Sequence, residues 1–170
     1  MRILVAPDKF KGSLTAAEVC HAIHDAIHAI LPDALIESIP MADGGEGTCL
    51  LLTEHFKGKQ VYTEVHDPLF RKIKSSYGIS NDGTTAWIEM ASASGLSLLD
   101  LHKRDPLYTS SFGTGEMILH ALNSGVKNIV LGISGSATTD GGIGMAAALG
   151  YRFFDEAEKI LHPIGKNLIH

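Results

Sequence analysis

The sequence predicts an α/β fold, and three observations support this prediction. Short apolar runs alternate with amphipathic stretches along the chain, and glycine-rich loops separate them. Hydrophobic residues form 45% of the composition and 18 of the 170 residues are glycine, which is typical of a folded α/β protein. A chain of this length can bury roughly 70% of the surface that it exposes when unfolded. We therefore expect one sizeable domain or two small lobes built around a parallel sheet.

The N-terminal part of the chain contains the order strand, loop and helix twice. Thr15 and Glu18 form a T-x-x-E capping box, which predicts that a helix begins there, and Pro32 predicts its end. Two such units in succession favour parallel strands. The predicted elements of this part are strands at 2–6 and 35–40, loops at 7–14 and 41–48, and helices at 15–31 and 49–55.

The central part has a different pattern. Three stretches alternate apolar and polar residues, and the turn Asn81-Asp82-Gly83 joins the last two, which predicts an antiparallel meander. Because the pattern changes there, we place a lobe boundary between residues 58 and 59, giving lobes 1–58 and 59–170. The predicted elements are strands at 60–66, 72–79, 85–90, 129–131 and 151–154, a helix opened by 109–116, and a hairpin at 155–162.

Charge and composition exclude several classes of function. The net charge of −5 gives no basic field that would favour nucleic acid. The apolar start at residues 3–6 is too short for a signal peptide or a membrane span. Cys20 and Cys49 form no metal motif, and two thiols without a leader are expected to be reduced. We infer a cytoplasmic protein that binds neither nucleic acid nor membranes.

The strongest candidate site is the segment 128–150. Its apolar run predicts a buried strand, and a loop rich in Gly, Ser and Thr follows and leads into a helix. A loop between the carboxyl end of a strand and a helix N-terminus is where α/β proteins bind phosphates. Asp140 is the one charged residue in this loop. Because a loop that only held phosphate would favour a cation, Asp140 suggests a metal ion or a proton to be moved.

Three further loops also combine glycine with acids or hydroxyls. In the loop 7–13, Lys11 and Ser13 precede a helix N-terminus and suit an anion, although an ordinary turn with solvated lysines explains them equally well. In the loop 41–48, Asp43 and Glu46 flank two glycines and suit Mg²⁺ or a hydroxyl, although a glycine turn with a capping acid is common. The third loop, 109–116, opens a helix, where its Glu116 is also explained as a first-turn acid.

Known short sequence motifs limit the kinds of nucleotide-binding and nucleophilic sites that the chain can contain. The P-loop pattern GxxxxGK[ST] and the nucleophile pattern G-x-S-x-G are absent from the sequence. Residues 142–147 fit G-x-G-x-x-A but begin too far past the strand, so a dinucleotide-dependent enzyme is a weak alternative.

In a parallel sheet the four glycine-rich loops would meet at one edge. The residues alone therefore predict a phosphate-handling α/β enzyme that uses a divalent metal.

The loops together resemble those of the bacterial glycerate kinase family. The resemblance is carried, in order, by PDKFKGSLTAAEV, PMADGGEGT, DPLFRKI, IEMASASGLSLL, PLYTSSFGTGE and GISGSATTDGGIGMAAALG. It implies transfer of the γ-phosphate of ATP to D-glycerate with Mg²⁺, and 2-phosphoglycerate is favoured over 3-phosphoglycerate as the product. It also implies two α/β lobes around a cleft: a parallel Rossmann- or flavodoxin-like sheet, and a second lobe that contains the antiparallel meander.

The chain departs from the family pattern in its length and at five residues, Lys9, Phe70, Asp105, Ser134 and Thr139. Family members are much longer, and this chain resembles only their first half, so we expect a truncated chain in which both lobes are incomplete. Phe70 stands where a glycine is usual before Arg71. The length puts the activity of the chain by itself in doubt, and the alternative is a non-catalytic nucleotide- or anion-binding fragment. Apolar surface left by the missing lobe halves would favour self-association.

The resemblance and the loop chemistry together suggest the site residues. Asp140, Asp43 and Lys11 are the candidate catalytic residues, and Asp43 and Asp140 are the candidate Mg²⁺ ligands. The candidates for binding phosphate or substrate are Ser13, Gly44, Gly45, Glu46, Thr114, Gly115, Gly135, Ser136, Thr138, Gly141 and Gly142.

Overall fold

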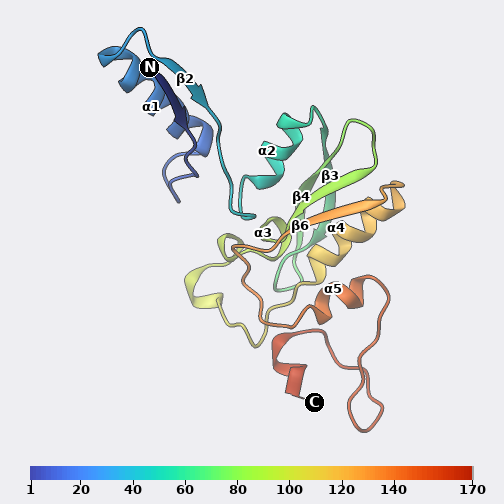
Figure 1. Cartoon of the computed structure of the whole chain (residues 1–170). Helices are drawn as coiled ribbons and strands as arrows, with labels where there is room; N and C mark the ends of the chain where they lie inside the picture. Colours follow the sequence, from blue (N-terminus) through green and yellow to red (C-terminus); the bar gives the residue numbers. More distant parts are fainter. Residues whose placement is uncertain (170) are drawn as a thin grey trace. The chain divides into compact units, whose positions relative to one another are not determined.

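A computed structural model describes residues 1–169, and the predicted α/β class is confirmed. The chain forms two compact units, one from Met1 to Asp43 and one from Gly44 onward (Figure 1). The first contains a two-stranded sheet and the second a four-stranded sheet. The division at residues 58 and 59 expected from the sequence falls inside the second unit, because the helix α2 (Thr48–His55) packs against the four-stranded sheet.

The first unit consists of β1 (Arg2–Val5), α1 (Ala16–Ile30) and β2 (Leu35–Ser38). The two strands pair in parallel, as the sequence predicts. The predicted capping box is also confirmed, because the Glu18 amide donates to Thr15 Oγ1 at 3.2 Å and the Thr15 amide donates to Glu18 Oε2 at 2.7 Å. These reciprocal bonds satisfy two backbone donors that a helix N-terminus otherwise leaves unpaired.

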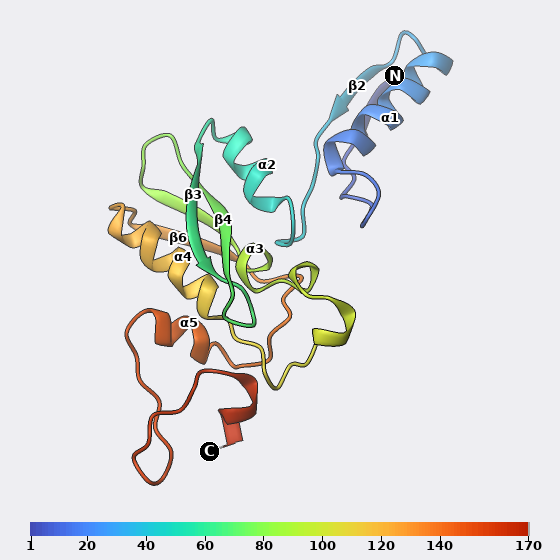
Figure 2. The same cartoon turned by 180° about the vertical axis from the view of Figure 1, so that it is seen from behind.

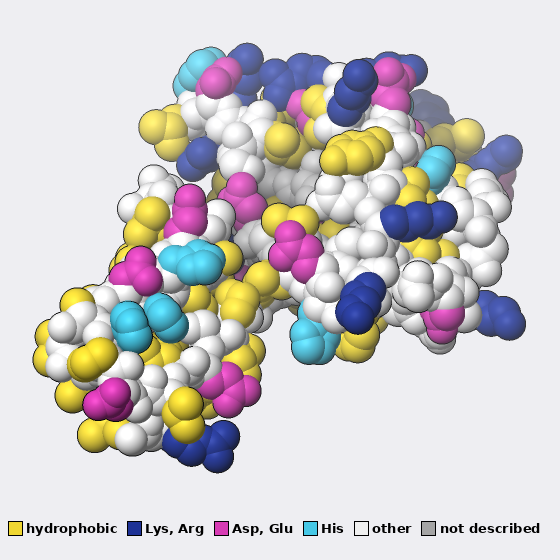
Figure 3. Space-filling view, turned by 90° about the horizontal axis from the view of Figure 1, so that it is seen from above, with side chains coloured by type: hydrophobic (Ala, Val, Ile, Leu, Met, Phe, Trp, Pro, Cys, Tyr) yellow, Lys and Arg dark blue, Asp and Glu magenta, His cyan; other side chains and the backbone are white. Residues whose placement is uncertain are grey.

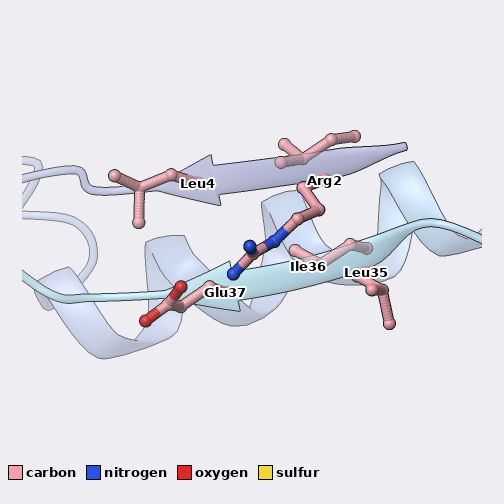
Figure 4. A pocket seen from close by; sticks show the side chains of 6 residues that line it. Arg2, Leu4, Leu35, Ile36 and Glu37 are labelled. Carbon is pink, nitrogen blue, oxygen red and sulfur yellow. The ribbon is translucent and has the colours of Figure 1, made fainter.

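One face of the two-stranded sheet carries a pocket of about 600 Å³ lined by residues of β1 and β2. In Figure 4, α1 runs behind the strands and the Arg2 side chain extends across β2 toward Glu37. Leu4 and Leu35 are 63% and 69% exposed. Parallel sheets are usually covered on both faces. The first unit by itself therefore leaves apolar residues of a parallel sheet in contact with solvent.

The second unit is built on a mixed sheet in the order β3-β4-β5-β6. The strands are β3 (Lys59–His66), β4 (Lys72–Ile79), β5 (Thr85–Glu89) and β6 (Asn128–Gly132). The first three strands are antiparallel neighbours, so the predicted meander is confirmed. β6 then pairs in parallel with β5, which brings Glu89 and Gly132 together at the carboxyl end of both strands.

Helices cover both faces of this sheet. The other helices of the unit are α3 (Ala91–Ser94), α4 (Phe112–Asn123) and α5 (Ile143–Ala148). The Tyr77 hydroxyl hydrogen-bonds His120 of α4, whereas a Cβ at the next residue, Gly78, would meet Thr53 of α2. Because successive strand residues point to opposite faces, α4 and α2 lie on opposite sides of the sheet, as Figures 1 and 2 also show.

The core of the second unit lies between the sheet and α4. Its buried members include Tyr77, Ile88 and Met117, which are at most 2% exposed. On the other face, Trp87 stacks on Phe56 with ring centroids 5.4 Å apart. Burial of this apolar surface on both faces is the main stabilising contribution to the unit.

One predicted element is wrong. Residues 151–153 form no strand, and only an isolated antiparallel bridge joins Phe154 to Ile160. The predicted hairpin at 155–162 is reduced to this bridge and a turn in which the Asp155 amide donates to the Lys159 carbonyl. The Tyr151 amide instead donates to the Ala146 carbonyl at the end of α5, so the segment continues a helix terminus rather than a sheet.

Candidate active site

The first glycine-rich loop is a tight turn within the first unit. The Phe10 amide donates to the Leu14 carbonyl and the Ser13 amide donates to the Phe10 carbonyl, each at 2.9 Å. Gly12 has a φ of 74°, a left-handed conformation that glycine adopts without strain. Lys11 and Ser13 are exposed at this turn. The turn therefore presents both predicted anion-binding residues to solvent.

Lys9 is the cation that meets the candidate acid Asp43. Its Nζ lies 3.3 Å from Asp43 Oδ1 and 3.8 Å from Asp8 Oδ1. Asp43 is partly exposed, with 41% of its side chain accessible. The sequence suggested Lys11 as the catalytic cation, but Lys9 is the lysine that the structure brings to this carboxylate.

The second glycine-rich loop lies against the start of the fourth. The Gly44 carbonyl oxygen would be only 2.1 Å from a Cβ built on Gly132, so only glycine fits at the end of β6. Gly47 has a φ of 96° and is the N-cap residue of α2. Gly45 is buried, while Glu46 is exposed. Two of the loops predicted to share a sheet edge thus touch there.

Glu89, which was not among the predicted site residues, lies beside this contact. It is 7% exposed, and its Oε1 accepts a hydrogen bond from the Cys49 amide at 2.5 Å. Its Oε2 lies 3.3 Å from Ser92 Oγ, which donates to it. Burial raises the pKa of Glu89, and the amides of Cys49 and Gly47 partly offset this rise. Burial and the nearby Glu89 charge raise the pKa of the Cys49 thiol.

The third loop leads into the first turn of α4, which confirms the prediction that it opens a helix. Thr114 is fully buried, and its hydroxyl lies 2.7 Å from Ser94 Oγ and 3.4 Å from the Met90 carbonyl oxygen. A Cβ on Gly115 would lie 2.5 Å from the Met145 carbonyl oxygen, so this glycine allows α4 and α5 to pack closely. Both predicted binding residues contact protein atoms in the structure.

Asp140, the single carboxylate of the fourth loop, accepts four hydrogen bonds. Its Oδ2 accepts from the Ser111 amide at 2.7 Å, from Ser111 Oγ at 2.8 Å and from the Gly144 amide at 3.2 Å. Its Oδ1 accepts from the Gly142 amide at 3.1 Å. The side chain is 1% exposed. Asp140 therefore connects the N-terminus of α4 to that of α5.

The remaining residues of the fourth loop are closer to solvent. Gly135, Gly141 and Gly142 have φ values of 75°, 58° and 81°, which a side chain would make costly. Ser136 forms an isolated bridge with Gly95. Gly135 and Gly141 are exposed, and Ser136, Thr138 and Gly142 are partly buried. This part of the loop keeps backbone groups accessible next to the rigid Asp140 network.

Within residues 1–169 there is no group of three or more His, Cys, Asp or Glu side chains arranged to hold a metal ion. The two candidate ligands belong to different compact units, Asp43 to the first and Asp140 to the second. Lys11 and Ser13 also belong to the first unit, whereas the other predicted site residues, from Gly44 to Gly142, lie in the second. The structure thus assembles the second, third and fourth loops at the carboxyl end of β5 and β6.

Comparison with known proteins identifies the family of the chain. Residues 3–170 match the model of the glycerate kinase family. The chain belongs to the glycerate kinase family. It is 52% identical over 165 residues to a glycerate kinase of Haemophilus influenzae, covering 97% of this chain and 43% of that protein. It is 53% identical over 155 residues to a glycerate 2-kinase of Escherichia coli, covering 91% and 41%.

A solved structure supports the fold assignment. The chain matches a protein described as glycerate kinase 2 of Salmonella typhimurium LT2 with a TM-score of 0.80 and 48% identity. The match covers 97% of this chain and 44% of that one. The chain therefore spans less than half the length of the relatives that it matches.

Proposed function

We propose that this chain supplies part of the site at which a glycerate kinase transfers the γ-phosphoryl group of ATP to D-glycerate. The family match over residues 3–170 carries the proposal, together with the kinase names of the relatives. Phosphoryl transfer depends mainly on positioning and on donors aimed at the transferred group. Three loops at one sheet edge, with accessible backbone groups, suit that task. The name of the Escherichia coli relative favours 2-phosphoglycerate as the product.

The proposed roles follow the exposure of each residue. Lys11 and Ser13, exposed on a turn before α1, would hold a phosphate or the glycerate carboxylate. Backbone amides of the fourth loop would face the phosphates, with Ser136 and Thr138 adding hydroxyl donors. Gly44 and Glu46 would bind substrate from the adjoining loop, and the buried Gly45 would contribute by shaping that loop. Thr114 and Gly115, which are buried, would contribute by fixing the start of α4.

Mg²⁺ is the metal that the donor chemistry fits. Mg²⁺ is usually held by one or two carboxylates together with substrate phosphates. Asp43 offers one such carboxylate, which is partly exposed and would exchange its ion pair with Lys9 for the metal ion. When bound, Mg²⁺ would neutralise charge on the transferring phosphoryl group.

Asp140 is better suited to positioning than to metal binding. Asp140 accepts three hydrogen bonds on Oδ2 and one on Oδ1. Because the side chain is only 1% exposed, a metal ion or a substrate proton could reach it only if the surrounding loop opened. We therefore propose that Asp140 orients the Gly141–Gly142 turn and the α4 N-terminus toward the phosphates.

A non-catalytic nucleotide- or anion-binding chain is the second candidate, because the chain covers less than half of its relatives. Self-association belongs to the same proposal. Leu35 and Leu4 on β2 and β1 are largely exposed, and hydrophobic side chains reach the surface at several places in Figure 3. Sedimentation velocity over a range of concentrations tests this, and a constant monomer would contradict it.

A cytoplasmic location is proposed on the cysteines. Cys20 and Cys49 are both free and buried, as expected of a reducing compartment. Among the described residues, no helix has the length and apolar character needed to cross a membrane. Cell fractionation tests the location.

A coupled assay with ATP, Mg²⁺ and D-glycerate tests the kinase proposal. It would be run on this chain and on a chimera in which this chain replaces the matching N-terminal part of the Haemophilus influenzae glycerate kinase. The proposal predicts phosphoglycerate from the chimera. A folded chimera without turnover would overturn it. Binding of ATP–Mg²⁺ without turnover, measured by calorimetry, would support the second candidate instead.

A further inference from the structure

The segment from Glu89 to Leu96 contacts all three glycine-rich loops of the second unit. The Met90 amide donates to the Gly132 carbonyl at 2.8 Å, and the Leu96 amide donates to the Gly135 carbonyl at 3.0 Å. The Ser94 hydroxyl lies 2.7 Å from that of Thr114 in α4. Glu89 reaches the second loop through the N-terminus of α2. This segment is therefore the shared support of the site.

Glu89 provides the hydrogen-bond acceptor that the residues next to the N-terminus of α2 do not supply. The N-cap residue Gly47 has no side chain to accept a backbone hydrogen bond, and the first turn of α2 contains no acid. A helix N-terminus leaves its first amides unpaired and favours a negative charge. The Glu89 carboxyl group supplies the acceptor from the end of β5, 40 residues away along the chain, whereas burial outweighs the benefit of a negative charge there.

We propose that Glu89 is a positioning residue that fixes the second glycine-rich loop, Gly44–Gly47, against Gly132 at the carboxyl end of the sheet. Without the Glu89 carboxylate, the Cys49 amide would lose its acceptor in a buried setting. The loop would then no longer be held at the edge where Gly44 meets Gly132. The effect on the loop is independent of the reaction, whereas the effect on catalysis rests on the proposed function.

The titratable groups that face Glu89 are Cys49 on α2 and Glu46 in the loop before it. Burial raises the pKa of Glu89 above its ordinary value of 4.5. The state in which the second loop is held against Gly132 therefore favours the protonated Glu89 carboxyl. The contribution of Glu89 to holding the loop is therefore full below pH 4.5 and is lost as the pH rises through the raised pKa of Glu89. Protection of the Cys49 amide should therefore fall across this pH window.

Amide hydrogen exchange on the chain measures the loop directly. In Glu89→Ala the amides of Gly47 and Cys49 should exchange about tenfold faster or more, while the Ala121 amide in α4 changes by less than about twofold. Glu89→Gln should keep part of the protection, because its carbonyl can still accept from Cys49, and should lose the pH dependence. Glu116→Gln, which removes the same charge near β3, is the matched control.

Two exchange results would overturn the proposal. They are unchanged exchange at Gly47 and Cys49, or an equal acceleration at Ala121 that marks general destabilisation.

In the chimera, Glu89→Ala should lower kcat and raise KM for D-glycerate, and Glu89→Gln should restore part of kcat. Loss of loop protection with unaltered kcat and KM would also contradict the positioning role. An inactive unsubstituted chimera would count against the proposed function alone, because the exchange result does not depend on turnover.

Discussion

The two compact units use their sheets in different ways. From Gly44 onward, four strands lie between α2 on one face and α4 on the other, and the core residues Tyr77 and Met117 are fully buried. From Met1 to Asp43, one helix covers one face of two parallel strands, and Leu4 and Leu35 are more than half exposed on them. The comparison teaches that the loops of the second unit rest on a sheet with helices on both faces, whereas the first loop rests on a sheet that buries only one face.

The largest expected difference between the units is in the response to truncating a methionine. Met117→Ala should lower the free energy of unfolding by about 2–5 kcal/mol, because Met117 is fully buried between α4 and the sheet. Met41→Ala, the same change at a residue that is 49% exposed in the first unit, should cost no more than about 0.5 kcal/mol. Denaturant unfolding followed by circular dichroism measures both. Equal effects would remove the contrast between the units.

The capping box should matter most in the unit with the smaller core. Thr15→Ala should destabilise α1 by about 1 kcal/mol, because the Glu18 amide loses its acceptor. Thr15→Ser keeps a hydroxyl and is the matched control. Residue-resolved hydrogen exchange at the Val19 amide, which donates to the Thr15 carbonyl, measures the effect.

The same variant has a predicted pH dependence. Hydrogen bonds from the amide and hydroxyl of Thr15 lower the pKa of Glu18 below its ordinary value of 4.5. The stabilisation is therefore present above 4.5 and is lost as the pH falls through the lowered pKa. The difference between Thr15→Ala and the unaltered chain should shrink in acid, and a difference that grows there would contradict the capping account.

An effect of similar size is expected at Phe70, a residue of the second unit with a strained backbone. Phe70 has a φ of 59°, and its ring packs 4.5 Å from that of His162 and 5.7 Å from that of Phe112. Phe70→Gly and Phe70→Ala both lose this packing, but only glycine relieves the backbone. The glycine variant should be more stable than the alanine variant by about 1 kcal/mol in thermal unfolding. An alanine variant as stable as the glycine variant would mean that the backbone is unstrained there.

Local patterns predicted much of the fold because their cause lies within a few residues. The capping box of Thr15, the alternation of the meander and the turn at Asp82 are examples. The strand expected at 151–154 failed because a strand also needs a partner, and Tyr151 bonds the end of α5 instead. The usual glycine at position 70 has a visible cause in the positive φ there.

The site was less predictable because its contacts join distant parts of the chain. In the sequence, Asp140 was an acid without an evident partner. In the structure, the amide and hydroxyl of Ser111, 29 residues earlier, both donate hydrogen bonds to it. Thr114 and Gly115, predicted to bind phosphate or substrate, pack inside the start of α4 against distant segments of the chain. Glu89 was missed, although an acid at the end of an apolar strand was a signal that could have marked it.

The measurement that tests the account most directly is the kinetics of Asp140→Asn in the chimera. Asparagine must turn its NH₂ group toward at least the Gly142 amide, a donor that now meets Oδ1, so the loop should lose its geometry. We predict that kcat/KM for D-glycerate falls by about a hundredfold or more. Asp100→Asn, at an exposed ion pair with Lys103, should change it by less than about twofold. An Asp140→Asn chimera within about twofold of the unaltered one would contradict the proposal that this network holds the phosphoryl-transfer site.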